Sequence, residues 1–255
     1  MIQLSVNVNK IATMRNSRGG DIPNLVEYSE IILNSGVGGL TVHPREDERH
    51  IKRQDVTDLN NLIKSFNKKH SKEMEYNIEG EPSERILEIV LHEKPSQATL
   101  VPVQPGEITS HKGFHLKEDY KVLEPLVKKI KAQGVRVAIF VESNIADLEY
   151  AKDMGVDRIE LYTGPFAFEF SKGFKEGEKS FQEYCKTAEK ALSLGIEINA
   201  GHDLDHENLK LMRNLPGLKE VSIGHRLISY ALLVGLPNCL KTYLETLSGE
   251  NIPVG

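Results

Sequence analysis

INAGH (residues 198–202) and VSIGH (residues 221–225) each run from apolar residues straight into a glycine and a histidine. Four further segments share this design, because in each a hydrophobic run ends on polar or reactive residues: VNVNK (6–10), GLTVHPRED (39–47), YNIEG (76–80) and RIELYTG (158–164). Buried strands that deliver polar groups at their carboxyl ends are typical of an α/β barrel, in which the strand ends surround one mouth. The segments therefore predict such a barrel, with an active site at that mouth.

The rest of the chain alternates between strand and helix periodicity. Apolar, β-branched runs predict strands at residues 4–9, 39–43, 74–79, 98–103, 136–141, 158–162, 197–200 and 220–223. Helical patterns lie between them, at residues 24–36, 55–66, 82–94, 120–134, 144–155, 179–195, 206–217 and 228–247. Several end on a glycine suited to a left-handed helix cap: Gly36, Gly134, Gly155 and Gly195. This alternation predicts a parallel sheet that closes into a (β/α)8 barrel.

An open, doubly wound sheet is the main competing fold. It would normally carry a glycine-rich dinucleotide turn after the first strand. In this chain the corresponding turn is NKIATMRNSRGG (9–20), which has no GxGxxG pattern. Closure into a barrel is therefore favoured.

Length and composition set the class of protein. The 255 residues match one α/β barrel and contain no linker, so we expect a single domain over residues 1–255. A net charge of −5 argues against a nucleic-acid-binding protein, so a bound phosphate must meet a local cluster of cations. No segment approaches the roughly 20 apolar residues of a membrane span. Cys185 and Cys239 are too few for a disulfide framework, and we expect a cytoplasmic protein.

The charged loop after the second predicted strand is a candidate substrate-binding edge. His43 opens the segment HPREDERH (43–50), which also contains Arg45, Arg49 and His50. Taken alone, the segment is better explained as a solvated charged loop. Beside the other strand ends it fits a phosphate and acid/base site, because arginine presents a planar fork to phosphate oxygens.

Two carboxylates lie within or at the end of predicted strands. Glu79 ends MEYNIEG and Glu160 lies inside RIELYTG, both among apolar residues. A carboxylate inside a barrel is costly unless it is paired or functional, and burial raises its pKa. Two such groups indicate proton transfer, although either one could instead point outward or form a salt bridge.

The loops after the seventh and eighth predicted strands are the usual phosphate site of this barrel. Here Gly201 precedes His202, and Gly224 precedes His225. Glycine lets backbone N–H groups close on an anion, and a following helix start adds a favourable dipole. His202 can act as an acid or a base near neutral pH. No HExxH or CxxC pattern occurs, so the sequence implies no metal.

Seven segments in this order and spacing resemble the pyridoxine 5′-phosphate synthase family: SVNVNKIATMRNSRGG (5–20), GLTVHPREDERHI (39–51), EYNIEG (75–80), ATLVPVQPGEITS (98–110), RIELYTG (158–164), INAGHDL (198–204) and VSIGHRLI (221–228). The resemblance covers essentially the whole chain. It implies a (β/α)8 TIM barrel with extra helices that condenses 1-deoxy-D-xylulose 5-phosphate with 3-amino-2-oxopropyl phosphate. The implied products are pyridoxine 5′-phosphate, inorganic phosphate and water, formed without a metal or organic cofactor by a homo-octamer.

The resemblance also implies roles for individual residues. In catalysis, it implies His43 and Glu79 as proton acceptors, His202 as a proton donor and Glu160 as a stabiliser of the transition state. For the aminoketone phosphate it implies the ligands Asn7, Arg18, Gly224 and His225. For the pentulose phosphate it implies the ligands Arg45, His50 and Thr109, with Asn9 and Lys10 as further binding candidates.

The chain departs from the commoner family pattern at three places. Asn9 and Lys10 stand where many members have Asp-His, Asp203 follows the catalytic histidine in place of glycine, and Pro44 replaces leucine. Two alternative functions stay open. One is an aldolase that forms a Schiff base through Lys10, since a desolvated lysine at a barrel mouth can be a nucleophile. The other is a non-catalytic barrel that binds phosphorylated ligands.

Overall fold

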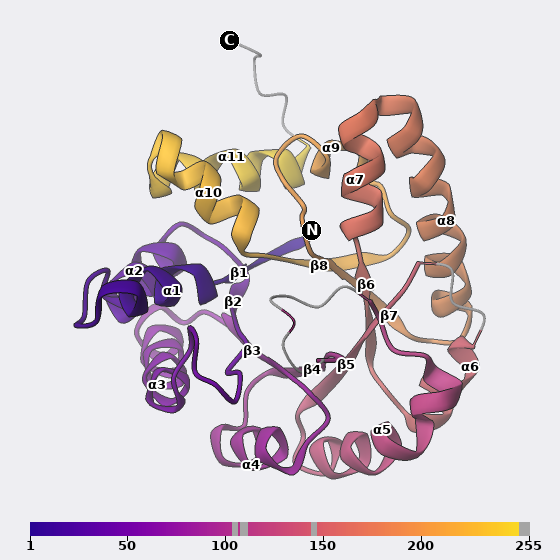
Figure 1. The fold of residues 1–255 in the computed structure, drawn as a ribbon, viewed down its shortest axis with the longest axis horizontal. Helices are drawn as coiled ribbons and strands as arrows, with labels where there is room; N and C mark the ends of the chain where they lie inside the picture. The colour runs from indigo at the N-terminus through magenta and orange to yellow at the C-terminus, as the bar shows by residue number, and fades with distance from the viewer. Residues whose placement is uncertain (104–106, 108–111, 144–146, 250–255) are drawn as a thin grey trace.

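The computed structural model describes residues 1–255 except 104–106, 108–111, 144–146 and 250–255, and its strands form a closed parallel barrel (Figure 1). Each strand pairs with its neighbours in chain order, and β1 pairs with β8 to close the sheet. The strands are β1 (Gln3–Asn7), β2 (Gly39–Val42), β3 (Glu75–Gly80), β4 (Gln97–Leu100), β5 (Arg136–Val141), β6 (Arg158–Tyr162), β7 (Glu197–Gly201) and β8 (Leu218–Ile223). The predicted fold class is confirmed.

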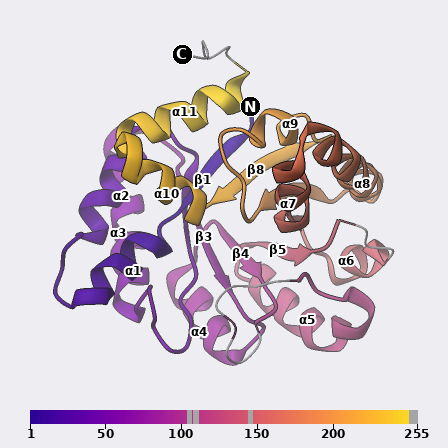
Figure 2. The same ribbon diagram turned by 45° about the horizontal axis from the view of Figure 1, so that its top comes forward.

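The helices surround the barrel, as Figures 1 and 2 show from two directions. They are α1 (Asn9–Arg18), α2 (Leu25–Asn34), α3 (Arg53–His70), α4 (Glu84–Glu93), α5 (Leu116–Lys131), α6 (Leu148–Met154), α7 (Gly164–Lys172), α8 (Phe174–Ser193), α9 (Leu209–Met212), α10 (His225–Val234) and α11 (Leu236–Ser248). Two helices instead of one follow each of β1, β6 and β8. The last helix, α11, packs against β1, α2 and α9. The predicted glycine caps at 36, 134, 155 and 195 all have positive φ, as expected.

The first strand and the segment after it differ from the prediction. The strand was expected to reach Asn9, but it ends at Asn7, because Val8 leaves the extended conformation with φ −89° and ψ 6°. The Asn7 side chain then accepts the backbone N–H of Asn9 at 3.1 Å, which turns the chain directly into α1. Residues 9–20 were interpreted as a turn because α1 buries only Ile11, Ala12 and Arg15, so no apolar stripe marks the helix.

Three other helical segments also differ from prediction. The short helix α7 follows β6 and was not expected. The pattern at 206–217 forms helix only over Leu209–Met212. The pattern at 228–247 is two helices, because Gly235 has φ 81° and Pro237 lies in the first turn of α11. A proline is tolerated at a helix start but not in its interior, so the break falls before it.

The hydrophobic core lies between the strands and the helices. In β3 the Tyr76 hydroxyl donates to the carbonyl of Val56 in α3, so the even-numbered side chains of that strand face outward. The odd-numbered ones face the bore of the barrel, where Asn77 Oδ1 accepts the Thr99 hydroxyl at 2.9 Å. The bore is therefore lined by polar groups, and the apolar residues form a ring around it.

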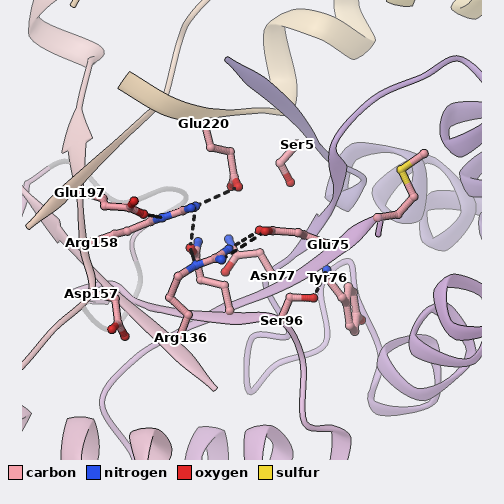
Figure 3. A network of polar contacts seen from close by, with 12 residues as sticks. Ser5, Glu75, Tyr76, Asn77, Ser96, Arg136, Asp157, Arg158, Glu197 and Glu220 are labelled. Atoms are coloured by element: carbon pink, nitrogen blue, oxygen red, sulfur yellow. Dashed lines mark hydrogen bonds and ion pairs between the residues drawn. The ribbon is translucent and has the colours of Figure 1, made fainter. Parts of the chain in front are cut away.

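At the amino-terminal end of the bore, two arginines link their strands to adjacent strands and to strands two places away (Figure 3). Arg136 donates to Gln97 at 2.9 Å and pairs with Glu75. Arg158 pairs with Glu197 at 3.0 Å and with Glu220 at 3.4 Å. These contacts fix the end of the barrel opposite to the candidate site.

Candidate active site

A cavity of about 640 Å³ lies at the carboxyl ends of the strands, where the sequence predicted the site. Most of the predicted site residues line it: Asn7, Asn9, Lys10, His43, Arg45, His50, Glu79, Glu160, His202, Gly224 and His225. Arg18 does not, because it is exposed at the end of α1. Thr109 lies outside the described residues. The fold thus brings together side chains from strands, helices and loops that are far apart in sequence.

Glu79 projects from β3 into the centre of this cavity. Its carboxylate accepts Asn7 Nδ2 at 3.4 Å and the Ser222 hydroxyl at 3.5 Å, and His43 Nδ1 lies 3.8 Å from Oε2. Burial raises the pKa of Glu79 to about 7; the Ser222 hydrogen bond opposes this rise and repulsion from Glu220 adds to it. Glu79 can therefore take up and release a proton near neutral pH.

Glu160 projects from β6 and is 3% exposed. Its Oε2 has no hydrogen-bond partner within the described part of the chain. Burial, followed by repulsion from Glu79 and Glu220, raises the pKa of Glu160 well above its ordinary value. A β-carbon at Gly201 would lie 2.4 Å from Glu160 Oε1, so glycine at that position makes room for the carboxyl group. The alternative of outward-facing or salt-bridged glutamates does not hold for Glu160.

His43 directly follows β2 and is a buried, neutral imidazole. Burial, and then the positive charge of Arg45, lower the pKa of His43 to about 3. Its backbone N–H donates to Asn9 Oδ1 at 3.0 Å, so the Asn9 side chain holds the end of β2 in place. A neutral imidazole is the form that accepts a proton, and its contact with Glu79 is between two groups able to share one.

The loop after β2 forms a cationic edge of the cavity. His43, Arg45 and His50 are buried, which excludes the interpretation of a fully solvated loop. Arg45 and Arg49 both donate to the carbonyl oxygen of Glu107, each at 3.0 Å. His50 Nδ1 accepts the N–H of Ile51 at 2.9 Å, while burial and the charge of Arg45 lower the pKa of His50 to about 4.

A buried ion pair holds the loop after β2, which forms the cationic edge of the cavity. Arg15 of α1 contacts both carboxylate oxygens of Asp55 in α3, at 2.6 and 2.8 Å. It also donates to the backbone carbonyl of His50 at 3.3 Å. Asp55 in turn accepts the N–H of Lys52 at the start of α3. The pair therefore connects the helix after β1 to the loop that carries Arg45 and His50.

The loop after β7 presents His202 to the cavity. The His202 ring lies edge-on to Tyr162, with ring centroids 5.0 Å apart, and its Nδ1 is 3.1 Å from Asp203 Oδ2. His202 and Asp203 have φ of 87° and 57°, a conformation that is costly for residues other than glycine. The Thr163 hydroxyl donates to the carbonyl of Gly201 at 2.7 Å.

Next to the β7 loop, after the neighbouring strand β8, a helix amino terminus borders the mouth. Helix α10 begins at His225, directly after Gly224, so the unpaired N–H groups of its first turn lie at the end of β8. A β-carbon at Gly224 would approach both the β-carbon and the carbonyl of Asn7 to 3.1 Å. Burial, and then the charge of Lys10, lower the pKa of His225. The amino-terminal end of α10 is therefore suited to binding an anion.

Lys10 reaches the cavity from α1. It lies in the first helical turn, because β1 ends at Asn7. It is only half-buried. Its charge acts on both His50 and His225, which follow the two strands that flank β1.

Some cavity residues escaped the sequence-based prediction. Ser222 shares with Glu220 the alternation that faces the bore, a signal that could have identified it. Asp203 adjoins a predicted residue but was set aside as a departure from a pattern. Tyr162 also lines the cavity, as does Arg49 of the predicted substrate-binding edge. Within the described ranges, no group of three or more His, Cys, Asp or Glu side chains could hold a metal ion.

Comparison with known proteins gives concordant matches. The family model described as "Pyridoxal phosphate biosynthesis protein PdxJ" matches residues 4–249. A pyridoxine 5′-phosphate synthase of Leptospira biflexa serovar Patoc is 52% identical over 98% of this chain and 99% of its own length. One from Flavobacterium johnsoniae is 45% identical, covering 97% of this chain and 100% of its own length.

Among solved structures, phosphoribosyl anthranilate isomerase from Thermotoga maritima aligns with a TM-score of 0.58 over 98% of this chain and 100% of that one. At 14% identity this likeness concerns the barrel fold alone. The family match and the relatives span nearly the full chain, and both carry the vitamin B6 biosynthesis name. The chain belongs to the PdxJ family of pyridoxal phosphate biosynthesis proteins.

Proposed function

We propose that this chain is a pyridoxine 5′-phosphate synthase. It joins 3-amino-2-oxopropyl phosphate to 1-deoxy-D-xylulose 5-phosphate and releases pyridoxine 5′-phosphate, inorganic phosphate and water. The observation that carries the proposal is the Glu79–His43 contact of 3.8 Å, between a carboxyl group with a pKa of about 7 and a neutral imidazole. The named relatives support the same activity.

The chemistry requires repeated proton transfers and no redox step. The substrate amine and ketone form an imine, water and phosphate leave, and the ring closes, each with movement of protons on carbon, nitrogen or oxygen. Glu79 and His43 act as proton acceptors and His202 as a proton donor in this proposal. In this proposal Glu160 stabilises the transition state, because its carboxyl group is buried close to Glu79. No metal or organic cofactor is required.

Two anion sites, after the two strands that flank β1, hold the two phosphates in this proposal. Asn7, Gly224 and His225 bind the aminoketone phosphate at the start of α10. Arg45 and His50 bind the pentulose phosphate, with Lys10 and Asn9 beside them. From the family resemblance we keep Arg18 as a ligand of the first phosphate and Thr109 as a ligand of the second.

We also propose a single domain over residues 1–255, supported by one sheet that includes β1 and β8 and by the return of α11 to β1. A homo-octamer is supported by large apolar side chains that are exposed on α10, Leu232 and Leu233. No described helix is long and apolar enough to cross a membrane. We propose a cytoplasmic location, because the two cysteines are free thiols, as is usual in a reducing compartment.

Incubation of the purified protein with both phosphorylated substrates tests the activity. We expect pyridoxine 5′-phosphate and one equivalent of inorganic phosphate for each ring formed. Omission of either substrate is the control. Binding of both substrates without product over a range of pH would contradict the proposal and favour a non-catalytic barrel.

A substitution at Lys10 separates the proposal from an aldolase. If Lys10 acts as a charge on phosphate, Lys10→Arg keeps substantial activity and Lys10→Ala raises KM for the pentulose phosphate by about tenfold to a hundredfold. Arginine cannot form an imine, so an aldolase would lose all turnover in Lys10→Arg. Borohydride trapping of a substrate on Lys10 in the wild type would support the aldolase.

A further inference from the structure

We propose that Asp203 is a positioning residue for His202. Its carboxylate holds Nδ1 of the imidazole, so that Nε2 is the nitrogen that exchanges a proton with the substrate. The inference deepens the proposed function and rests on it, since it concerns how His202 acts as the acid. It assigns a role to one of the positions at which the chain departs from the commoner family pattern.

The geometry of the β7 loop carries the proposal. Asp203 Oδ2 lies 3.1 Å from His202 Nδ1, although the two residues are adjacent in sequence. Neighbouring side chains usually diverge; these two converge because both residues have positive φ. The backbone carbonyl of Asp203 accepts Asn208 Nδ2 at 3.1 Å, which holds this strained conformation. Strain of this kind is found where the surrounding structure enforces it, often at functional sites.

The second carboxylate oxygen faces the phosphate side of the mouth. Asp203 Oδ1 lies 4.0 Å from Nε of Arg226, in the first turn of α10. Besides His202, the groups whose charge acts on Asp203 are His225 and Arg226 of α10, and Asp203 in turn acts on Tyr162 of β6. Asp203 is thus the acidic group between the acid His202 and the end of the helix that suits phosphate.

The proposed step is a proton transfer with a defined origin and destination. The Nε2–H bond of the imidazolium breaks, and the proton goes to the oxygen that leaves the substrate. The electron pair of that bond stays on Nε2, and the remaining proton stays on Nδ1, where the Asp203 carboxylate accepts its hydrogen bond. A carboxylate in this position selects the Nδ1–H tautomer of the neutral ring, as in a serine protease triad.

Two substitutions at Asp203 test the inference. Asp203→Asn keeps the size of the side chain and removes its charge, and Asp203→Gly removes the side chain while tolerating φ of 57°. We expect both to lower kcat by about tenfold to a hundredfold with little change in KM, less than the roughly 10⁴-fold loss for a buried pair in a protease. The smaller effect follows from the 35% exposure of the Asp203 side chain.

The ring nitrogens of His202, observed by 15N NMR, give a measurement independent of activity. The neutral wild-type ring holds the Nδ1–H tautomer, and Asp203→Asn shifts it toward Nε2–H. Glu207→Gln is the matched control, because Glu207 also follows a histidine, contacts His206 at 3.5 Å and does not line the cavity. It leaves kcat and the His202 tautomer unchanged.

The possible outcomes distinguish a failure of the role of Asp203 from a failure of the proposed function. An unchanged tautomer together with an unchanged kcat in Asp203→Asn would overturn the role of Asp203. So would full activity in Asp203→Gly. A changed tautomer with unchanged kcat would support the positioning contact and remove His202 as the acid, which is a failure of the proposed mechanism alone. Absence of product from the wild-type protein would be a failure of the proposed function.

Discussion

At the residue scale, the position of Glu79 determines the strongest expected loss of activity. Glu79→Gln keeps the hydrogen-bonding shape of the side chain but cannot accept a proton. We expect kcat to fall by roughly 10²-fold or more, the usual loss for a general base, while both substrates still bind. Steady-state kinetics of Glu79→Gln beside Glu84→Gln, a change at an exposed position, measures this. Wild-type turnover in Glu79→Gln would remove Glu79 from the mechanism.

The same carboxylate makes the stability of the fold depend on pH. The pKa of Glu79 is raised to about 7 by burial, so the folded protein holds this proton more tightly than the unfolded chain does. Its contribution to the free energy of unfolding is therefore complete below about pH 4.5 and is lost as the pH rises through about 7. The loss is on the order of 3 kcal/mol.

Chemical denaturation at pH 5 and pH 8 measures this dependence. Glu79→Gln has no charge to desolvate, so we expect its free energy of unfolding to fall less between the two pH values than that of the wild type. His43 has a lowered pKa, which gives the opposite dependence, with stability lost as the pH falls from about 6.5 toward 3. Because His43 is present in both proteins, the difference between them reports Glu79. Equal slopes would contradict the raised pKa.

Gly201 gives a steric prediction beside Glu160. A methyl group at Gly201 would lie 2.4 Å from Glu160 Oε1, so Gly201→Ala forces the carboxyl group to move. We expect kcat to fall by about tenfold or more, together with a loss of about 1–3 kcal/mol of stability from overpacking. The double variant Gly201→Ala/Glu160→Asp shortens the carboxylate side chain and should recover stability. If Gly201→Ala matches the wild type in both measurements, the close approach has no consequence.

At the scale of elements, the Arg15–Asp55 pair between α1 and α3 is the contact most sensitive to change. Both side chains are buried, so Arg15→Met leaves Asp55 as an uncompensated charge. We expect a loss of about 3–5 kcal/mol in the free energy of unfolding. KM for the pentulose phosphate should rise, because Arg15 also holds the backbone of His50.

Urea denaturation and substrate titration of Arg15→Met measure the two effects. The double variant Arg15→Met/Asp55→Asn is the control, since asparagine removes the stranded charge and can still accept the N–H of Lys52. It should recover part of the stability. An equally unstable double variant would show that the pairing charge is not the cause.

Elements were predictable from the sequence where one physical signal dominated. The strands are buried on both faces of the sheet region, and their β-branched runs identified β5 and β6 with the observed bounds. Helix α1 was missed because its buried residues include Arg15, whose role depends on Asp55 some forty residues later. The break between α10 and α11 was missed because Gly235 and Pro237 interrupt an apolar pattern that otherwise continues.

The candidate site was likewise predictable only in part. Its position followed from strand ends, and most of its residues followed from family motifs. The hydrogen bonds that orient them did not, because they join residues far apart in the chain, such as Ser222 to Glu79. The positive φ of Asp203 is compatible with the sequence, because aspartate adopts it more often than most other residues and glycine is commoner at this position in the family, but neither fact identifies its contact with His202.

At the scale of the whole molecule, the exposed face of α10 predicts self-association. Leu232 and Leu233 are 70% and 82% exposed, which is costly for adjacent large apolar side chains in water. We expect Leu232→Glu/Leu233→Glu to reduce the mass of the assembly, measured by light scattering after size-exclusion chromatography. Lys241→Glu, on the neighbouring helix α11, is the control at an exposed position. An unchanged mass in the leucine variant would exclude this face from assembly.

In this barrel the cohesion of the fold and the chemistry of the bore depend on different sets of side chains, whereas most protein cores do not separate them. Apolar residues form a ring between strands and helices, and this ring supplies the cohesion of the fold. The bore can therefore vary in chemistry while the ring keeps its packing, since successive residues of each strand face opposite sides. Evolution can accordingly alter a substrate by changing alternate residues of a strand and leave the architecture intact. The residues of the bore can therefore change while the apolar ring that maintains the fold stays the same.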